Sequence, residues 1–409
     1  MIDRVTRNQL AYSRPPWLRL EHFPVQSALR PGRSASSIGH SIARDRGRAL
    51  REISIVKKVL VVVACSALFC FSASAWAQVK FVQLTSPIQS WSNYALSGNG
   101  KVMAANIGGE IFRWTSVGGF VDLGLGDTFN SSIGISADGN TIVTGRTGSD
   151  GNSNPAMWQE ATGWVDLGHP AEGCVLDGSW GDAWGVNSDG SIVVGLAWYC
   201  PGAEGFQWTK QGGIVGLGHP SNASSRATTI SADGSTIVGF YEDPVQGFRR
   251  PVRWISGSTD LFLGDIPGEA IAVSSDGAQI VGQAADSTGN GRAFYYTGTG
   301  GLVSLGVLSG NKTDQSVAFG ISDNGIVIGA SINSFTFSSQ PFVWSTKMGL
   351  HRLQAVLAGH GAVIPSGVTL TNVLAISADG TTIVGLWLDA SFNQGPWIAY
   401  VHGKAALLK

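Results

Sequence analysis

A short pattern of apolar and polar residues recurs along the chain, and each copy predicts two β-strands joined by a tight turn. In "ISADGSTIVG", residues 230–239, an apolar position leads into a polar Ser-Ala-Asp-Gly turn, and a β-branched run follows. Asp-Gly between apolar runs is a strong hairpin signal because Gly adopts positive φ at little cost. Seven copies occur, and the Gly of each Asp-Gly or Asn-Gly pair lies at Gly100, Gly139, Gly190, Gly234, Gly277, Gly325 and Gly380.

Two further strands are predicted after each hairpin. A third run ends in an aromatic residue, as in "GFQWT" at 205–209, and a fourth run follows a Gly turn, as in "IVGLG" at 214–218. Four short strands at a period of about 45 residues are typical of the blades of a β-propeller. The sequence therefore predicts an all-β fold with four antiparallel strands per blade.

The count of strands predicts how the ring closes. The repeats supply seven first, second and third strands but only six fourth strands, and an unassigned apolar run lies at Phe81–Leu84. A propeller closes when its N-terminal strand completes the last blade, which removes open edges that promote aggregation. We therefore expect seven blades, the last closed by Phe81–Leu84. An open β-solenoid is the alternative, and it would leave this strand unpaired.

Residues 56–77 have the composition of a secretory signal peptide. Two lysines precede an apolar run at 59–71, and an Ala-Trp-Ala cleavage site ends at Ala77. The run is too short to cross a bilayer comfortably, so we expect a secreted or periplasmic protein with no membrane span in the mature chain. The alternatives are a lipoprotein signal with Cys65 and a buried core strand.

Charge divides the chain into unlike parts. Residues 1–55 contain ten Arg and no Lys, and we interpret them as an untranslated or disordered extension before the signal. Residues 78–409, the predicted propeller domain, hold 15 basic and 24 acidic residues, a formal charge of −9. An acidic body without basic clusters argues against nucleic-acid binding, which needs concentrated positive charge.

The residues repeated in every blade are interpreted as structural. One aromatic at the same place in each unit most simply fills the space between adjacent sheets. A lone Asp per turn lacks the oxygen density of a calcium site, so no metal site is predicted. The repeated aromatics are Trp114, Trp158, Trp208, Trp254, Trp344 and Trp397, with Tyr296 in the remaining blade.

The complete unit resembles the HAF repeat of extracellular bacterial proteins. That repeat combines S-x-D-G-x-x-I-V-G with an aromatic-x-W-T strand and a final G-G-h-x-D-L-G, in which h is apolar. The resemblance covers Phe81 to Val401, and the nearest match to the naming His-Ala-Phe triplet is Arg292-Ala293-Phe294. It implies export and a propeller, and it implies no particular reaction.

Loop lengths point to one face of the propeller. With strands labelled A to D, the A–B and C–D turns lie on one face and the B–C and D–A connections on the other, because neighbouring strands are antiparallel. The A–B turns are uniformly tight, whereas the B–C and D–A loops vary in length. In repeat folds the face that carries such variation is often the binding face.

The third blade is predicted to carry a disulfide and a ligand site on that face. Cys174 lies in its D–A loop and Cys200 in its B–C loop, and exported cysteines pair readily, so we expect a Cys174–Cys200 disulfide. Exposed aromatic side chains with acidic neighbours suit sugar stacking or protein contact. The candidate ligand-binding residues are Trp180, Trp184, Trp198, Asp177 and Asp182. Alternatively, the three indoles pack around the disulfide as a small local core.

No linear motif indicates catalysis. The chain lacks G-x-S-x-G, H-E-x-x-H and a phosphate-binding loop, so neither an enzyme nor a cofactor is predicted. We predict a monomeric binding module that takes a glycan or a protein on the face of the B–C and D–A loops. The alternatives are a glycan-active hydrolase or lyase with its site at the channel mouth, and a structural scaffold of the envelope.

Overall fold

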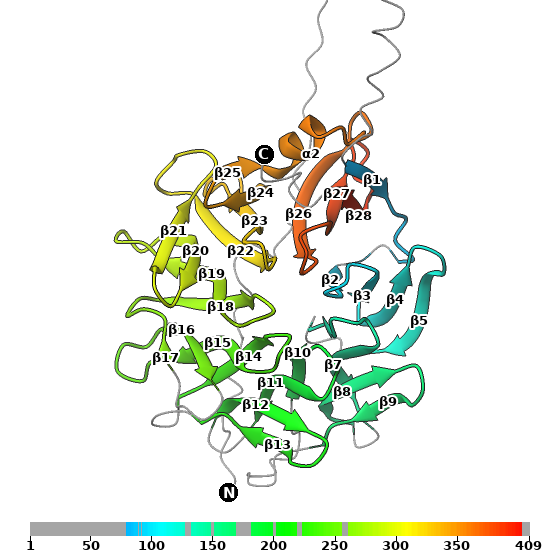
Figure 1. Cartoon of the computed structure of the whole chain (residues 1–409), viewed down its shortest axis with the longest axis vertical. Helices are drawn as coiled ribbons and strands as arrows, with labels where there is room; N and C mark the ends of the chain where they lie inside the picture. Colours follow the sequence, from blue (N-terminus) through cyan, green and yellow to red (C-terminus); the bar gives the residue numbers. More distant parts are fainter. Residues whose placement is uncertain are drawn as a thin grey trace, which may run out of the picture. The chain divides into compact units, whose positions relative to one another are not determined.

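The protein forms a ring of seven four-stranded antiparallel sheets (Figure 1). The structure is a computed structural model and describes residues 79–88, 90, 92–126, 132–148, 151–168, 181–198, 202–218, 223–255 and 261–402. All the described strands lie in one compact unit, Trp76–Lys409.

Each of the first six blades uses four consecutive strands. Blade 1 comprises β2 (Ser92–Leu96), β3 (Val102–Ile107), β4 (Glu110–Thr115) and β5 (Gly119–Leu125). Blade 2 comprises β6 (Gly134–Ile135), β7 (Thr141–Thr147), β8 (Ser153–Gln159) and β9 (Gly163–Asp166). Blade 3 comprises β10 (Gly181–Val186), β11 (Ile192–Trp198), β12 (Ala203–Thr209) and β13 (Gly213–Gly216).

The second half of the ring follows the same plan. Blade 4 comprises β14 (Ser225–Ile230), β15 (Thr236–Glu242), β16 (Arg249–Ile255) and β17 (Leu261–Phe262). Blade 5 comprises β18 (Gly268–Val273), β19 (Gln279–Ala285), β20 (Gly291–Thr297) and β21 (Gly301–Gly306). Blade 6 comprises β22 (Gln315–Ile321), β23 (Val327–Ile332), β24 (Ser339–Ser345) and β25 (Gly349–Arg352). Blade 7 comprises β26 (Thr369–Ile376), β27 (Thr382–Leu388), β28 (Gln394–Val401) and the N-terminal strand β1 (Val79–Gln83).

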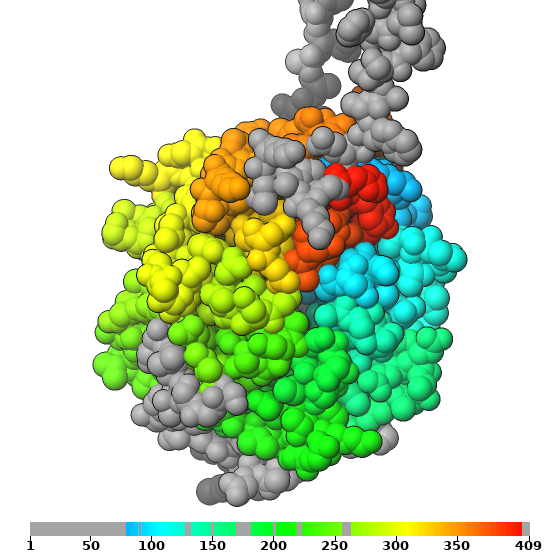
Figure 2. All heavy atoms as spheres, viewed as in Figure 1, coloured from blue at the N-terminus to red at the C-terminus, as the bar shows by residue number. Residues whose placement is uncertain are grey.

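The N-terminal strand closes the ring as the strand count predicts. β1 pairs antiparallel with β28, with Phe81 opposite Ala399. Figure 2 shows the blue N-terminal segment against the red C-terminal blade. The first strands of neighbouring blades contact one another in an unbroken circle that includes β26 against β2. The seven-bladed propeller is therefore confirmed, and the β-solenoid alternative is wrong.

The repeated aromatics fill the space between sheets. Trp114, Trp208 and Trp254 are nearly fully buried. The assignment of Trp397 to this repeat position is wrong, because Trp397 pairs with Gly385 as Phe206 pairs with Gly195, and Ala399 stands where the other blades have the indole. Trp397 is fully buried all the same. Trp397 also stacks on Phe81 of β1 at a centroid distance of 5.8 Å, so the closing strand shares this core. Burial of such large rings is a main source of stability. The structural interpretation of the repeated indole is confirmed in blades 1, 3 and 4, where it is buried.

The Ser-x-Asp-Gly phrase recurs because its side chains build the A–B turn. Ser231 Oγ donates to Asp233 Oδ1 at 2.5 Å, and the Ser235 amide donates to the same oxygen at 2.9 Å. These hydrogen bonds, the one from Ser231 foremost, hold the pKa of Asp233 below its usual value. The Asp233 amide donates to the Ser275 carbonyl of the next blade at 3.2 Å. The turns therefore join adjacent blades, and this linking explains why the motif is repeated.

Within the described ranges, one helix interrupts the all-β pattern. Helix α2 (Leu353–Gly359) follows β25 directly, in the D–A connection between blades 6 and 7. Leu353 and Leu357 are fully buried in the cluster that contains Trp397. The helix has 7 residues, about two turns, and such a short apolar pattern cannot be distinguished from a strand in the sequence. Among the described residues, no helix has the length and apolarity needed to cross a membrane.

Candidate functional site

The structure separates two faces of the ring. We call the face of the B–C and D–A connections the variable face. Its fully described B–C connections join β3 to β4, β15 to β16, β19 to β20, β23 to β24 and β27 to β28. The opposite face carries the uniform A–B turns. The variable face is therefore where side-chain chemistry differs from blade to blade.

The first strands of blades 3 to 7 carry a β-bulge at one equivalent position. The register shifts between Ala183 and Gly185 in β10, and between Ala270 and Ala272 in β18, with matching shifts in the other blades. A bulge leaves one residue outside the ladder and re-aims its side chain. The residues left out at this position are Trp184, Thr228, Ile271, Phe319 and Leu374, all half-buried.

The bulge also explains the Gly that ends each Ile-Val-Gly run. A Cβ on Gly239 would lie 1.9 Å from the carbonyl oxygen of Arg226, and one on Gly282 would lie 2.1 Å from that of Glu269. The first strand approaches its neighbour too closely for any side chain there. The sequence shows this Gly in the copies of blades 3 to 7, whereas blades 1 and 2 have Ala105 and Thr144 there. These five blades are the ones in which the first strand carries the bulge.

A charged cluster lies near the start of the first strands in blades 3 to 5. The Arg226 guanidinium contacts the Glu269 carboxylate, and Thr228 Oγ1 donates to the same carboxylate oxygen at 3.0 Å. Arg226 Cζ lies 4.3 Å from the centroid of the Trp184 ring, a cation–π contact. The Arg226 and Glu269 side chains are 20% and 19% exposed, so solvent reaches them. We call Trp184, Arg226, Thr228 and Glu269 the mouth cluster.

Two hydrogen-bond donors of the mouth cluster are unused. Trp184 Nε1 and Arg226 Nε are both buried, and neither has an acceptor among the described residues. A buried donor without a partner costs about 1–3 kcal/mol. Arg113 Nε, Arg253 Nε and Trp254 Nε1 are in the same state elsewhere in the ring. The two donors of the mouth cluster lie side by side where β10 and β14 adjoin. Oxygen atoms of a bound molecule would satisfy both.

The structure places three of the predicted ligand residues in blade 3. Trp184 joins the mouth cluster, and Trp198 ends β11 half-buried. Asp182 in β10 is only 3% exposed and accepts a hydrogen bond from Ser132 Oγ at 3.4 Å. Trp180, Asp177, Cys174 and Cys200 lie outside the described residues. The predicted disulfide and the indole cluster therefore remain predictions.

Sequence reasoning missed Arg226 and Glu269. Each stands directly before the repeat Ala that precedes the bulge, in "SRATTI" and "GEAIAV". Asp182 occupies the same place in "GDAWGV", so three consecutive blades carry a charge there. That run of charges at one repeat position was the available signal.

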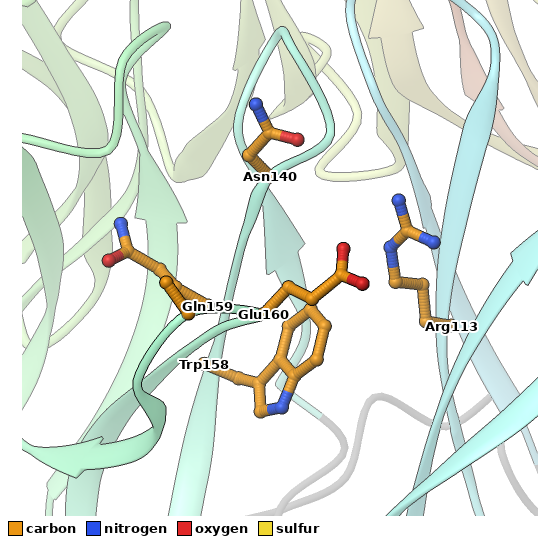
Figure 3. Close-up of a pocket in the computed structure, with 6 residues that line it drawn as sticks. Arg113, Asn140, Trp158, Gln159 and Glu160 are labelled. Carbon is orange, nitrogen blue, oxygen red and sulfur yellow. The ribbon is translucent and has the colours of Figure 1, made fainter.

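Two shallow pockets lie elsewhere on the ring. One, of about 240 Å³, is lined by Arg113, Asn140, Trp158, Gln159, Glu160 and Ala161, on the face of the A–B turns (Figure 3). In Figure 3 the Arg113 and Glu160 side chains lie above the Trp158 ring. The pocket is smaller than the roughly 300–1,000 Å³ of typical ligand sites. The other, of about 370 Å³, lies on the variable face beside the β27–β28 loop and includes Trp387 and Asp389.

Several described carboxylates are engaged in structural contacts. Glu204 is 8% exposed and accepts the Gly218 amide at 2.6 Å. Arg250 contacts both Asp243 and Asp265. Among the residues that the structure describes, no three His, Cys, Asp or Glu side chains group as metal ligands do.

Comparison with known proteins supports the fold. No family model matches the chain, and no curated protein matches its sequence. The β-propeller domain of the Trilobed protease from Pyrococcus furiosus, described as having an open velcro topology, is 11% identical with a TM-score of 0.51, covering 75% of this chain and 93% of that one. Here β1 instead pairs with β28.

Two further solved structures are similar. An acylaminoacyl peptidase is 11% identical with a TM-score of 0.50; the match covers 81% of this chain and only 53% of the peptidase. A putative TolB from Agrobacterium tumefaciens is 16% identical with a TM-score of 0.40, covering 55% of this chain and 87% of that one. At these identities the likeness concerns the fold alone.

Proposed function

We propose that this propeller is a non-catalytic binding protein that holds a glycan at the mouth cluster. The unused donors of Trp184 and Arg226 carry the proposal, because a sugar offers hydroxyl and ring oxygens to both. The Glu269 carboxylate accepts hydrogen bonds from hydroxyl groups, and an indole face suits stacking against a sugar ring. A glycan therefore matches the mixed chemistry of the cluster.

The position of the cluster supports the same function. Arg226 and Glu269 are each the second residue of a first strand, β14 and β18, and these strands begin on the variable face. A ligand at that end of the channel contacts three blades at once. Because each blade supplies a different side chain, the ring can specify a ligand there without changing its core.

Export completes the proposal. The signal at 56–77 and the resemblance to the HAF repeat both favour a protein that acts in the periplasm or outside the cell. In that setting Cys174 and Cys200 form a disulfide that ties two loops of blade 3 together. After treatment with an alkylating reagent under non-reducing conditions, the intact mass is expected to show no alkylated cysteine. Alkylation of both thiols would contradict the disulfide.

A glycan panel tests the function. Residues 78–409 are expected to bind at least one class of glycan, and Trp184→Phe is expected to bind about tenfold more weakly, since Phe keeps a ring but lacks the N–H donor. Trp344→Phe is the matched control, because Trp344 is an equally half-buried indole of the repeat. Failure of the parent to bind any glycan, or equal loss in both variants, would contradict the proposal.

A further inference from the structure

The B–C loops of blades 5 and 7 share one hydrogen-bonded geometry. In residues 286–290, Asp286 Oδ1 accepts the amides of residues 288 and 290, and the Gly289 amide donates to the Asp286 carbonyl at 2.9 Å. In residues 389–393, Asp389 Oδ1 accepts the amides of residues 391 and 393, and the Phe392 amide donates to the Asp389 carbonyl at 3.1 Å. Phe392 therefore occupies the position of Gly289.

The longer B–C loops of blades 4 and 6 form a second matched pair. In residues 243–248 the Gly247 amide donates to the Asp243 carbonyl at 2.8 Å. In residues 333–338 the Phe337 amide donates to the Asn333 carbonyl at 2.9 Å. In each loop the side-chain oxygen of the first residue, Asp243 or Asn333, accepts the amides of the residues two and three positions later. Phe337 therefore occupies the position of Gly247.

Both phenylalanines adopt a backbone conformation that suits glycine. The φ angles are +81° at Gly289 and +71° at Gly247, but also +63° at Phe392 and +55° at Phe337. These two are the only described residues other than Gly with positive φ. A bulky side chain there is strained, because its Cβ crowds the neighbouring carbonyl. The same unfavourable replacement has occurred in two different loop types.

The strained rings are also exposed. Phe392 is 78% and Phe337 64% exposed, and Phe335 beside it is 90% exposed. All three lie on the variable face, on blades 6 and 7, which adjoin in Figure 1. Packing therefore does not explain the rings, since strain and exposure both disfavour the folded state. Exposed apolar groups that stability does not require mark a contact surface.

The polar groups of the blade 6 loop are already satisfied. Every backbone amide of residues 333–338 donates to an acceptor within the chain. The hydroxyl of Thr336 donates to Asn333, and Asp314, which is 2% exposed, accepts both the amide and the hydroxyl of Ser334. A glycan would need free hydrogen-bonding groups, whereas insertion into lipid requires that backbone donors be satisfied internally.

The charges around the rings favour an electrically neutral surface. Residues 333–338, 360–368 and 389–393 contain no Lys or Arg, and Lys312 in the adjoining D–A loop is a single exposed cation. Binding to anionic lipid needs a cluster of basic residues. Val363, 83% exposed in the D–A loop before β26, adds another apolar side chain on this face.

We propose that the variable face docks onto a zwitterionic lipid bilayer by inserting the rings of Phe337 and Phe392, aided by Phe335. Separate rings on rigid loops match a bilayer, which accepts apolar groups in any lateral arrangement, better than a protein pocket, which must match their spacing. This docking does not depend on the glycan site, since the two use different blades.

Flotation with phosphatidylcholine vesicles tests the docking. Residues 78–409 contain the whole ring, its core and its closing strand, so this unit is used without the apolar segment at 59–71. The parent is expected to float with the vesicles at low and high salt alike. The double variant Phe337→Gly/Phe392→Gly is expected to partition at least about tenfold more weakly. Val117→Ser, which removes an apolar side chain 98% exposed on the opposite face, is expected to match the parent.

The glycine variant separates docking from a folding defect. Because Gly relieves the strain at both positions, its thermal midpoint is expected to equal or exceed that of the parent. A parent that does not float, or a variant that floats equally, would overturn the proposal. It would also be overturned if sedimentation showed a parent dimer that the variant abolishes while neither protein floats, since the rings would then join two copies of the chain.

Discussion

The Gly of the Ile-Val-Gly run offers a sharp test of the bulged blade. In Gly282→Ala the new Cβ would lie 2.1 Å from the Glu269 carbonyl oxygen and 2.9 Å from Cε1 of Phe294. Ordinary contacts at Cβ begin at 3.4 Å, so the β18 backbone would have to move by more than about 1 Å. That movement would strain the ladder between β18 and β19 at the bulge.

The cost follows from overpacking a rigid site. Inserting one methyl group into a well-packed core typically costs about 1–3 kcal/mol. Here a backbone carbonyl, rather than a flexible side chain, must yield, so we expect a loss near the upper end, about 3 kcal/mol. The Arg226–Glu269 contact shares the displaced backbone, and its loosening would add to the loss.

A second glycine in the same blade provides the control. A Cβ on Gly298, in the β20–β21 turn, would have no heavy atom within 4 Å, and the φ angle of this residue is not left-handed. Gly298→Ala is therefore expected to be neutral or to stabilise by about 0.4–1 kcal/mol, through the unfolded state. Urea unfolding followed by far-ultraviolet circular dichroism measures both variants. If Gly282→Ala were as stable as Gly298→Ala, the close approach at the bulge would be refuted.

Three further outcomes are expected. Asp233 has a lowered pKa in the folded state, so its ionised form stabilises the fold. This stabilisation is present above the unfolded pKa of about 3.9 and is lost as pH falls through the folded pKa. In Asp233→Asn the free energy of unfolding should therefore fall less steeply at acid pH than in the parent, and an unchanged pH dependence would contradict this. Deleting residues 79–83 removes the partner of β28 and should lower the free energy of unfolding by more than about 3 kcal/mol, measured by the urea midpoint. Asp314→Ala removes the acceptor of the Ser334 amide, so amide hydrogen exchange at residues 333–338 should become faster. Unchanged exchange would show that the contacts within the loop are enough to keep it ordered.

The periodic features of the fold could be predicted because they repeat. Asp-Gly turns, β-branched runs and a recurring indole appear in nearly every unit, so one weak signal is confirmed several times. The closing strand followed from a missing fourth strand. β1, Val79–Gln83, overlaps the predicted Phe81–Leu84 in residues 81–83. Agreement among the copies therefore made the prediction possible, although no single blade has a strong signal.

The site could be predicted only in part, because it depends on departures from the repeat. Trp184 was identified from the sequence as a candidate ligand residue. The β-bulge at Trp184 is a shift of strand register, and the residue types alone do not indicate it. Arg226 stands near Trp184 only because β10 and β14 are neighbours in the ring. Phe337 and Phe392 are ordinary residues in the sequence, and only the backbone angles show that they replace glycine.

The structure of the protein in complex with its tightest glycan is the most direct test of the mouth cluster as the binding site. We predict ligand oxygens within about 2.7–3.2 Å of both Trp184 Nε1 and Arg226 Nε, the distance of an N–H···O hydrogen bond. A glycan bound elsewhere on the ring, with both donors still lacking a ligand oxygen, would contradict the account.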